Sequence, residues 1–216
     1  MPTTLLVVDD HAIVRQGLTM LLSKHPEFTV ISEASGVQEA LAVLKKKQPR
    51  IAIIDLSLKD GSGLDLLREI RRLYPDIICL VLSMHDEMEY AERALRAGAR
   101  GYVMKENADE VIVEALQTAL RGEVYASPDV TAQMLRNVAE GAPAADPDKG
   151  IASLTDRERE IFRSLGQGLT TKKIAEHYNL SARTVEVHRA SIKRKLQCED
   201  TAQLLREAVR WVEANP

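Results

Sequence analysis

Between Thr4 and Arg121, short apolar runs alternate with longer segments of helical periodicity. The short runs are rich in Val, Ile and Leu, whereas in the longer segments apolar residues recur every three or four positions. We expect strands at residues 5–8, 28–31, 51–54, 77–82 and 102–103. We expect helices at residues 13–24, 37–47, 64–74, 87–97 and 107–121. Because strands that helices cover on both faces are apolar throughout, this order predicts an α/β domain with a five-stranded parallel sheet.

The pattern changes after this region. Residues 123–150 end in a stretch rich in Ala, Pro and Asp, a composition typical of a linker. Within the linker, a short helix can begin at Ser127 with Pro128 at its first position. Residues 151–216 show helical periodicity throughout and predict an all-α domain of four helices.

Polar caps mark the expected helix starts of the second domain. Thr155 and Glu158 have the spacing of a capping box, in which each side chain binds the backbone N–H of the other residue. The remaining helices are expected to begin at Thr170 or Thr171, at Ser181 and at Asp200.

The composition is that of a folded protein. Of 216 residues, 45% are hydrophobic and 28% are charged, which excludes disordered and collagen-like chains. The two cysteines, Cys79 and Cys198, lie too far apart for a CxxC metal motif and are too few for a disulfide framework. No apolar run approaches the roughly 18 residues of a membrane span, and the first residues lack the basic region of a signal peptide. We therefore expect a cytoplasmic protein without membrane contact.

Charge is distributed unevenly along the chain. Residues 1–150 hold 17 Lys and Arg against 23 Asp and Glu, a net charge of −6. Residues 151–216 hold 12 against 9, a net charge of +3. The difference indicates separate partners for the two parts, and a small basic domain favours nucleic acid.

Charged and hydroxyl side chains gather just beyond the expected strands. Asp9 and Asp10 follow the first strand and Asp55 the third. Ser83 follows the fourth strand and Lys105 the fifth. Each residue alone is better explained as a helix cap, a turn residue or a solvated lysine, but capping does not explain the whole set at the ligand-binding edge of a parallel sheet. Adjacent carboxylates favour a hard cation such as Mg²⁺, and a lysine and a hydroxyl group can hold phosphoryl oxygens.

Four segments of the first domain resemble the motifs of a known family. LLVVDDH, IIDLSLKDGSGL, LVLSMHD and GARGYVMKENA are similar, in order and spacing, to those of the receiver domain of two-component response regulators. The resemblance covers about residues 3–122. It implies a CheY-like fold and a receiver domain at residues 1–122.

By this resemblance, Asp55 accepts a phosphoryl group and Mg²⁺ is the cofactor. Asp10 would bind Mg²⁺ directly, and Asp9 would act through a water molecule. Asp55 itself and the backbone carbonyl of Ser57 would complete the protein ligands.

The resemblance also implies a switch. Lys105 would pair with the phosphoryl group, Ser83 would be the switch hydroxyl, and Tyr102 would be the aromatic residue that rotates inward after it. Lys59 stands four residues after Asp55, where many receiver domains have Pro. From this departure we expect altered rigidity of the loop but unchanged chemistry.

Residues 181–196 predict an amphipathic basic helix with five basic side chains and one acidic side chain. Its apolar face carries Val185, Ile192 and Leu196 at 100° per residue. Its opposite face carries Arg183, Val187, Ala190 and Arg194, with Glu186 and Lys193 beside them. A basic helix that follows another helix after a short turn is the arrangement that enters the DNA major groove, although a solvated basic face explains the composition equally well.

The second domain resembles a DNA-binding family. The segment LTDREREIFRSLGQGLTTKKIAEHYNLSARTVEVHRASIKRKL is similar to the LuxR-type helix-turn-helix, and the resemblance covers residues 153–213. It implies a LuxR-type domain at residues 151–216, with a supporting helix at residues 170–178 and a recognition helix at residues 181–196. Together with the receiver domain, it makes nearly the whole chain similar to NarL/FixJ-type response regulators.

Two kinds of DNA contact are expected. Phosphate contacts are expected from Lys173, Arg183, Arg189, Lys193 and Arg194. Glu186 can accept a hydrogen bond from cytosine N4 and Val187 can contact a thymine methyl group, so both are expected to read bases. Ala190 lies on the same DNA-facing side, whereas His188, near the apolar face, is interpreted as structural.

The last expected helix carries an apolar stripe. It consists of Leu204, Leu205, Ala208, Val209 and Val212. Part of the stripe must pack within its own domain, and we expect the remainder to form a homodimer that binds half-sites about 10 bp apart.

These features predict a phosphorylation-dependent transcription regulator that is not an enzyme. Its partners would be a sensor histidine kinase, double-stranded promoter DNA and, once phosphorylated, a second copy of the chain. An alternative is a DNA-binding regulator of the same architecture that works without phosphorylation, which the complete set of strand-end residues disfavours. A phosphatase of the haloacid dehalogenase type is also disfavoured, because Leu56 and Ser57 after Asp55 do not provide the second carboxylate of a D-x-D motif.

Overall fold

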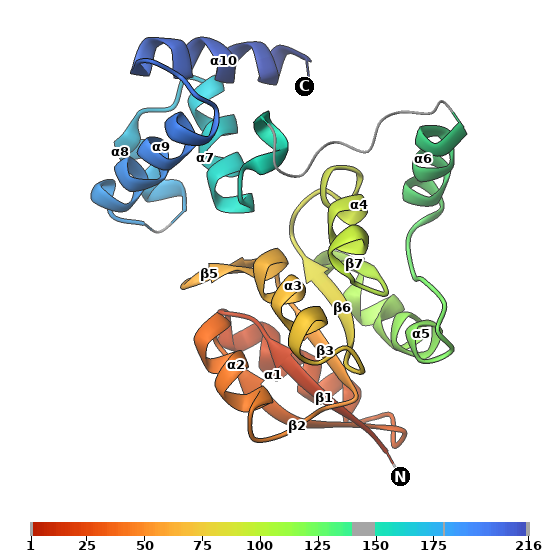
Figure 1. The fold of residues 1–216 in the computed structure, drawn as a ribbon. Coiled ribbons are helices and arrows are strands. Elements are labelled where there is room, and N and C mark those ends of the chain that lie inside the picture. The colour runs from red at the N-terminus through yellow and green to blue at the C-terminus, as the bar shows by residue number, and fades with distance from the viewer. Residues whose placement is uncertain (1, 140–149, 179, 215–216) are drawn as a thin grey trace. The chain divides into compact units, whose positions relative to one another are not determined.

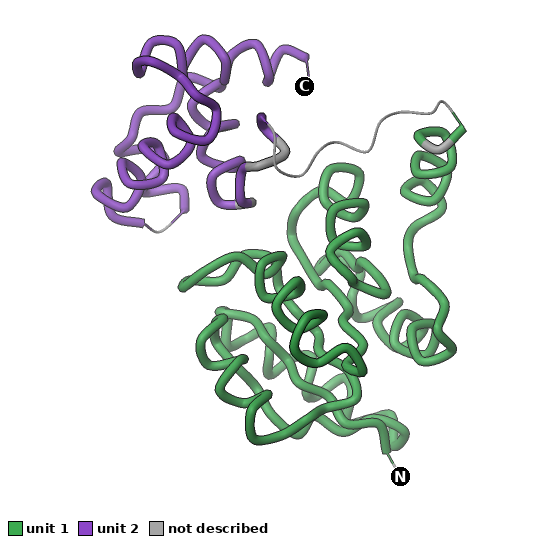
Figure 2. The backbone as a smooth tube through the Cα atoms, viewed as in Figure 1, with its two compact units in different colours: residues 1–142 green, residues 143–216 purple. Residues whose placement is uncertain are grey.

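The computed structural model describes residues 2–139, 150–178 and 180–214. It divides into two compact units, residues 1–142 and residues 143–216, which Figure 2 distinguishes by colour. The hydrophobic clusters of the first unit are separate from that of the second, so each unit is described by itself.

Within the described residues, the first unit is built on a five-stranded parallel sheet, which confirms the predicted α/β fold (Figure 1). Its strands are β1 (Thr3–Val8), β2 (Phe28–Ala34), β3 (Ile51–Ile54), β6 (Ile78–Ser83) and β7 (Tyr102–Met104). They lie in the order β2-β1-β3-β6-β7. Because the chain leaves β1 toward β2 and then returns to β3 on the other side, a crevice opens at the carboxyl ends of β1 and β3.

Helices cover both faces of this sheet. They are α1 (Ala12–Leu22), α2 (Val37–Leu44), α3 (Gly63–Leu73), α4 (Glu87–Ala97) and α5 (Ala108–Leu120), the last preceded by the 3-10 turn η1 (Lys105–Asn107). Along β1, Leu6 and Val8 pack with α2, α3 and α4, whereas Leu5 and Val7 pack with α1 and α5. Both faces of the strand are buried, which explains its unbroken apolar run.

A short antiparallel hairpin, β4 (Ser57–Leu58) and β5 (Gly61–Ser62), follows β3. At its tip, Asp60 accepts hydrogen bonds from the first two backbone N–H groups of α2 at 2.7 and 3.0 Å. Lys59 Nζ donates to Ser35 Oγ at 3.0 Å. Side-chain hydrogen bonds therefore tie this loop to the start of α2.

The first turn of α3 lies against the residue that follows β3. A Cβ atom at Gly63 would lie 2.1 Å from the backbone carbonyl oxygen of Asp55. Only glycine allows this close approach, which holds Asp55 between β3 and α3.

Tyr125 extends the sheet edge beside β7. Its N–H donates to the carbonyl of Arg100 at 2.9 Å, and its carbonyl accepts from the N–H of Tyr102 at 3.0 Å. This single parallel bridge places the chain after α5 along the outer side of β7. It also directs the chain toward α4.

The helix α6 (Pro128–Ala139) packs against α4 (Figure 1). Val130 is 3% exposed, and Met134 packs against the same cluster. From its composition, this short helix was expected within a linker at residues 123–150. In the structure it belongs to the first unit, because its apolar side chains are buried there. Residues 140–149 of that segment lie outside the described residues.

The second unit is helical. After the 3-10 turn η2 (Gly150–Ser153), its helices are α7 (Asp156–Gly166), α8 (Thr171–His177), α9 (Ala182–Lys195) and α10 (Thr201–Ala214). Thr155, Thr170 and Ser181 cap the first three of these helices at the predicted positions. Among the helices of the described residues, none is both long enough and apolar enough to cross a membrane.

Glu158 stabilises the second unit from a buried position. It completes the capping box of α7 with Thr155, and its carboxylate lies 2.6 Å from Lys195 Nζ at the end of α9. Burial alone would raise the pKa of Glu158, but hydrogen bonds from Lys195, Ser191 and the backbone of Thr155 outweigh burial and hold the pKa below its usual value. The ionised carboxylate therefore joins α7 to α9.

We expect Glu158→Ala to lower the free energy of unfolding of the second unit by about 1–3 kcal/mol, because it removes both the cap and the partner of Lys195. Since the pKa of Glu158 is lowered in the folded chain, the loss should be full near neutral pH and shrink as the pH falls through the pKa. Denaturant unfolding followed by fluorescence of Trp211, the chain's single tryptophan, measures this. Glu176→Ala, at an exposed position of α8, is the control, and equal effects of both variants would contradict the role of Glu158.

Candidate functional site

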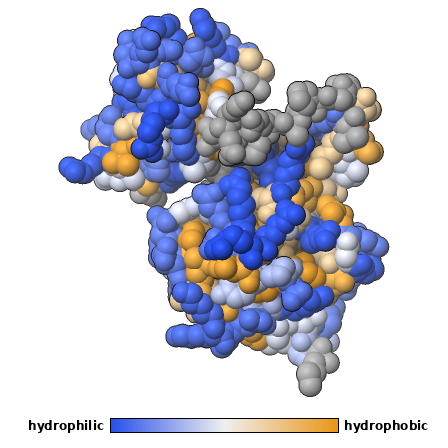
Figure 3. Space-filling view, in the orientation of Figure 1, coloured by the Kyte–Doolittle hydropathy of each residue, from blue (hydrophilic) through white to orange (hydrophobic). Residues whose placement is uncertain are grey.

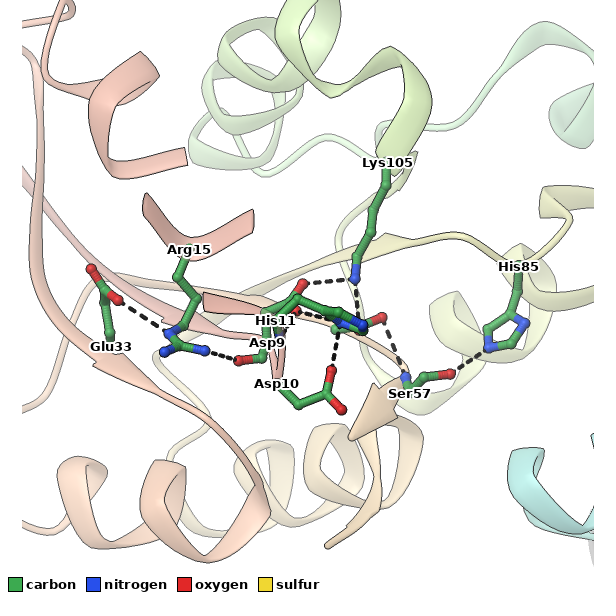
Figure 4. Close-up of polar contacts among 9 residues, drawn as sticks. Asp9, Asp10, His11, Arg15, Glu33, Ser57, His85 and Lys105 are labelled. Atoms are coloured by element: carbon green, nitrogen blue, oxygen red, sulfur yellow. Dashed lines mark hydrogen bonds and ion pairs between the residues drawn. The ribbon is translucent and has the colours of Figure 1, made fainter. Parts of the chain in front are cut away.

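Charged side chains from three strand ends meet at the carboxyl edge of the sheet (Figure 4). Asp9 and Asp10 follow β1, Asp55 follows β3, and Lys105 follows β7. Lys105 Nζ lies 2.7 Å from Asp9 Oδ2 and 2.7 Å from Asp55 Oδ2. Asp9 and Asp55 are each only 2% exposed, so the ammonium group compensates two buried carboxylates at once.

The environment of Asp55 raises its pKa above the usual value of an aspartate. Burial raises the pKa of Asp55 to about 6, and the nearby charge of Asp9 adds to this, while Lys105 acts in the opposite direction. Burial by itself would lower the pKa of Lys105, but the charges and hydrogen bonds of both carboxylates raise it. At neutral pH the site therefore contains an ionised Asp55 next to a protonated lysine.

The oxygen atoms of this cluster fit a hard divalent cation. Ligand atoms of Asp9, Asp10, Asp55 and His11 all lie within 4.8 Å of one another. The Nδ1 atom of His11 lies 2.7 Å from Asp10 Oδ1, and His11 is largely exposed at the rim. Because three of the four donors are carboxylates, the set suits Mg²⁺. Ser57, whose backbone carbonyl is the remaining predicted ligand, lies next to the cluster. Its N–H donates to Asp55 Oδ1 at 3.3 Å.

Ser83 and Tyr102 contact the same stretch of backbone beside the cluster. Ser83 is fully buried, and its Oγ accepts a hydrogen bond from the N–H of His85 at 3.1 Å. Tyr102 is 2% exposed, and its hydroxyl donates to the carbonyl of His85 at 2.8 Å. The aromatic ring predicted to rotate thus lies inward in this structure, anchored to the loop between β6 and α4.

His85 was not among the predicted site residues. Its Nε2 lies 2.7 Å from Ser57 Oγ (Figure 4). Its ring stacks on Tyr90 of α4 with centroids 4.7 Å apart. It therefore connects the loop after β3 with α4. Its place two residues after Ser83 in LVLSMHD was visible in the sequence, but no local pattern indicates which side chain it meets.

Arg15 also contacts the site, although it was not among the predicted site residues. Its guanidinium group donates to the carbonyl of Asp9 at 2.7 Å and to Glu33 Oε2 at 3.1 Å. It joins α1 to the end of β1 and holds the backbone of the acidic pair. The helical periodicity of the segment around Arg15 does not indicate this contact.

In the second unit, α9 presents the predicted face to solvent. Arg183, Val187, Ala190 and Arg194 are exposed, whereas Val185 and Ile192 are fully buried. Val187 is 63% exposed and lies on the same face as Arg183 and Arg194. On the face shown in Figure 3, hydrophilic residues cover most of the second unit, with isolated hydrophobic residues among them.

The other predicted DNA contacts lie beside this face. Lys173 is exposed on α8, and Lys193 is half-buried on α9. Arg189 is also half-buried; its Nη1 donates to Glu186 Oε1 at 2.8 Å and to Thr171 Oγ1 at 2.7 Å. His188 is half-buried, and burial lowers its pKa although Glu158 opposes the shift.

The apolar stripe of α10 is divided between core and surface. Leu204 and Ala208 are buried against the unit's own core. Leu205 and Val209 remain 37% and 40% exposed. The exposed part is available for contact with another molecule.

Comparison with known proteins gives two family matches. Residues 5–117 match the response regulator receiver domain, and residues 152–208 match the bacterial regulatory proteins of the luxR family. The oxygen regulatory protein NreC of Staphylococcus carnosus is 34% identical over 209 residues, which cover 95% of this chain and 96% of that protein. The transcriptional regulatory protein UhpA of Salmonella typhimurium is 36% identical over 201 residues, which cover 93% of this chain and 95% of that protein.

A solved structure matches over almost the whole chain. It is that of RcsB from Salmonella enterica serovar Typhimurium bound to a promoter in the presence of the phosphomimetic BeF3−. The match has a TM-score of 0.57 at 25% identity and covers 96% of this chain and 98% of that one.

We expect the affinity for Mg²⁺ to fall as Asp55 becomes protonated. Because its pKa is raised to about 6, the carboxylate is ionised above that pH and loses its charge below it. The affinity should therefore drop about tenfold between about pH 7.5 and about pH 5. Isothermal titration with Mg²⁺ measures this, and Asp55→Asn, which cannot titrate, should bind more weakly with a flatter pH profile. A parent affinity that stays constant over this range would contradict the assignment.

Proposed function

Because this chain belongs to the two-component response regulators that carry a receiver domain and a LuxR-family DNA-binding domain, we propose that phosphorylation of Asp55 controls its binding to promoter DNA. The observation that carries the proposal is the position of Lys105 Nζ, 2.7 Å from carboxylate oxygens of both Asp9 and Asp55. A buried carboxylate with a fixed cation beside it is a suitable acceptor for a phosphoryl group.

The phosphoryl donor is a phosphohistidine of a sensor kinase. An oxygen of Asp55 attacks the phosphorus atom in line, the P–O bond forms, and the P–N bond to the donor imidazole breaks. With its pKa at about 6, Asp55 is ionised and ready to attack near neutral pH. Lys105 then exchanges part of its contact with the carboxylate for a phosphoryl oxygen and neutralises its charge.

The acidic cluster would hold Mg²⁺ during this transfer. Asp10 and Asp55 would bind it directly, Asp9 would act through water, and the carbonyl of Ser57 would complete the protein ligands. When bound, Mg²⁺ supplies positive charge that stabilises the phosphoryl oxygens in the transition state. Asp9 also positions Lys105, because its Oδ2 lies 2.7 Å from Lys105 Nζ.

Phosphorylation acts on the rest of the first unit through Ser83 and Tyr102. The product carries about −1.5 to −2 of additional charge beside Lys105. Ser83 accepts a hydrogen bond from the backbone N–H of His85, and its hydroxyl proton can be donated to a phosphoryl oxygen. A shift of Ser83 moves the His85 backbone, to which the Tyr102 hydroxyl is bonded, and so reaches α4.

The output is binding of α9 in the major groove of double-stranded DNA. The exposed stripe of Arg183, Val187, Ala190 and Arg194 supports this proposal, because it combines phosphate-binding ends with an apolar centre that can meet base edges. Lys173 and Lys193 add phosphate contacts on either side. The similar RcsB structure was solved bound to a promoter, which supports promoter binding by this chain.

We expect one phosphoryl group to be added to the chain by a small phosphoryl donor with Mg²⁺, and none to Asp55→Asn. Intact-mass spectrometry of both proteins measures this, because the covalent acyl phosphate adds a defined mass. The phosphorylated parent should then select a preferred duplex from a randomised DNA library with higher affinity than the unphosphorylated parent.

If the phosphorylated and unphosphorylated parent proteins select DNA with equal affinity, the chain is a regulator that works without phosphorylation. Absence of any mass increase, with a Mg²⁺ affinity that depends on Asp55, would show that small donors do not suffice, and a kinase would then be required for the same comparison.

We expect the exposed apolar residues of α10 to form the homodimer of the phosphorylated chain. Leu205→Glu introduces a charge at the centre of this surface, so it should weaken dimerisation of phosphorylated protein by about tenfold or more. Light scattering coupled to gel filtration measures the dimer, and Leu205→Met, which preserves the apolar surface, is the control. Unchanged dimerisation of the charged variant would place the interface elsewhere.

A further inference from the structure

We propose that Glu186 is a positioning residue for DNA binding, which orients Arg189 toward a DNA phosphate instead of reading a base. This inference rests on the proposed DNA-binding function of α9. In this role, Glu186 would favour DNA binding although its negative charge repels phosphates.

Glu186, Arg189 and Thr171 form a closed triangle of hydrogen bonds. Thr171 Oγ1 donates to Glu186 Oε1 at 2.9 Å, and Arg189 Nη1 donates to the same oxygen at 2.8 Å. Arg189 Nη1 also donates to Thr171 Oγ1 at 2.7 Å. The hydroxyl group thus gives its proton to Glu186 and accepts one from Arg189, an assignment that satisfies each atom of the triangle.

The triangle joins two helices. Thr171 is the first residue of α8, and Glu186 and Arg189 lie three positions apart on the side of α9 that faces it. At 100° per residue, Glu186 lies about 70° from the centre of the exposed stripe of α9, and Arg189 lies farther in the same direction. A helix in the major groove turns its flanks toward the sugar-phosphate walls, so Glu186 lies at the margin of the stripe, and Arg189, about 130° from the centre, is on the side of a phosphate wall and away from the base edges.

The side chains of Glu186 and Arg189 differ in their exposure to solvent. The side chain of Glu186 is 56% exposed, whereas that of Arg189 is 18% exposed. An ion pair this close to solvent contributes little to stability by itself. It does fix the guanidinium plane, and with Nη1 engaged, the other N–H groups of that plane are held in one orientation before DNA arrives. Such preorganisation removes an ordering cost from binding.

The negative charge of Glu186 opposes DNA binding, whereas its hydrogen bond to Arg189 favours it. A carboxylate near DNA repels phosphates, so its removal relieves repulsion and at the same time releases Arg189. Glutamine separates the two effects, because it has no charge but retains an oxygen that can accept from Thr171 and Arg189. Alanine removes both the charge and the acceptor.

The test uses the full-length phosphorylated chain and the duplex that the parent selects from a randomised library. Fluorescence anisotropy at several salt concentrations gives the affinity and its salt dependence for Glu186→Ala, Glu186→Gln, Arg189→Ala and the Glu186→Ala/Arg189→Ala double variant. Glu176→Ala, which removes an exposed acidic charge of α8, controls for long-range electrostatics. Circular dichroism and Trp211 fluorescence confirm that each variant is folded.

We expect Glu186→Ala to weaken binding about threefold to tenfold and to reduce the slope of log affinity against log salt by about 1, as Arg189→Ala does. Glu186→Gln should retain most of the affinity, and the double variant should bind like Arg189→Ala alone, because both changes remove the same contact.

Two results would overturn this proposal. Tighter binding by Glu186→Ala and Glu186→Gln, matched by Glu176→Ala, would show that Glu186 only repels DNA. A changed sequence preference of the Glu186 variants with an unchanged salt slope would show that it reads a base. A parent chain that selects no duplex would overturn the proposed function itself, a result separate from any difference among variants.

Discussion

The first unit depends on one lysine that compensates two buried carboxylates. Burial of like charges is unfavourable unless a cation lies between them, and Lys105 supplies it to Asp9 and Asp55 at 2.7 Å each. These residues follow the first, third and last strands of the sheet, so they meet only when the strands assemble in the observed order. Fold and chemistry are therefore specified together, and a group that reacts with Asp55 must also change the environment of Lys105.

The parts of this protein that could be predicted are those with a local or periodic signal. Unbroken apolar runs identified the strands, capping residues such as Thr155 and Ser181 identified helix starts, and the rule that parallel strands share one functional edge brought Asp9, Asp55 and Lys105 together. The solvent-exposed stripe of α9 followed from helical periodicity in the same way. The strands, helix starts and helix faces can be read from neighbouring residues, and the shared edge needs only the further rule that parallel strands end on the same side.

Contacts between distant segments could not be predicted in this way. His85 meets Ser57 because two loops from different strands converge, and Glu186 meets Thr171 because α8 and α9 cross at that point. Neither contact follows from spacing along the chain. The same limit explains the boundary of the first unit: the composition of residues 123–150 indicates a linker, but only the packing of Val130 on α4 shows that α6 belongs to the sheet domain.

The bridge at Tyr125 has a further consequence, for the solubility of fragments. β7 is the last strand of the sheet, and Tyr125 occupies its outer side by pairing with Arg100 and Tyr102. A fragment that ends at residue 122 leaves these backbone groups unpaired and uncovers the surface of α4 on which Val130 rests. An open strand edge next to an apolar surface is a template for pairing with another chain. Self-association of such a shortened protein would therefore report strand addition at β7 and not the assembly of the intact regulator.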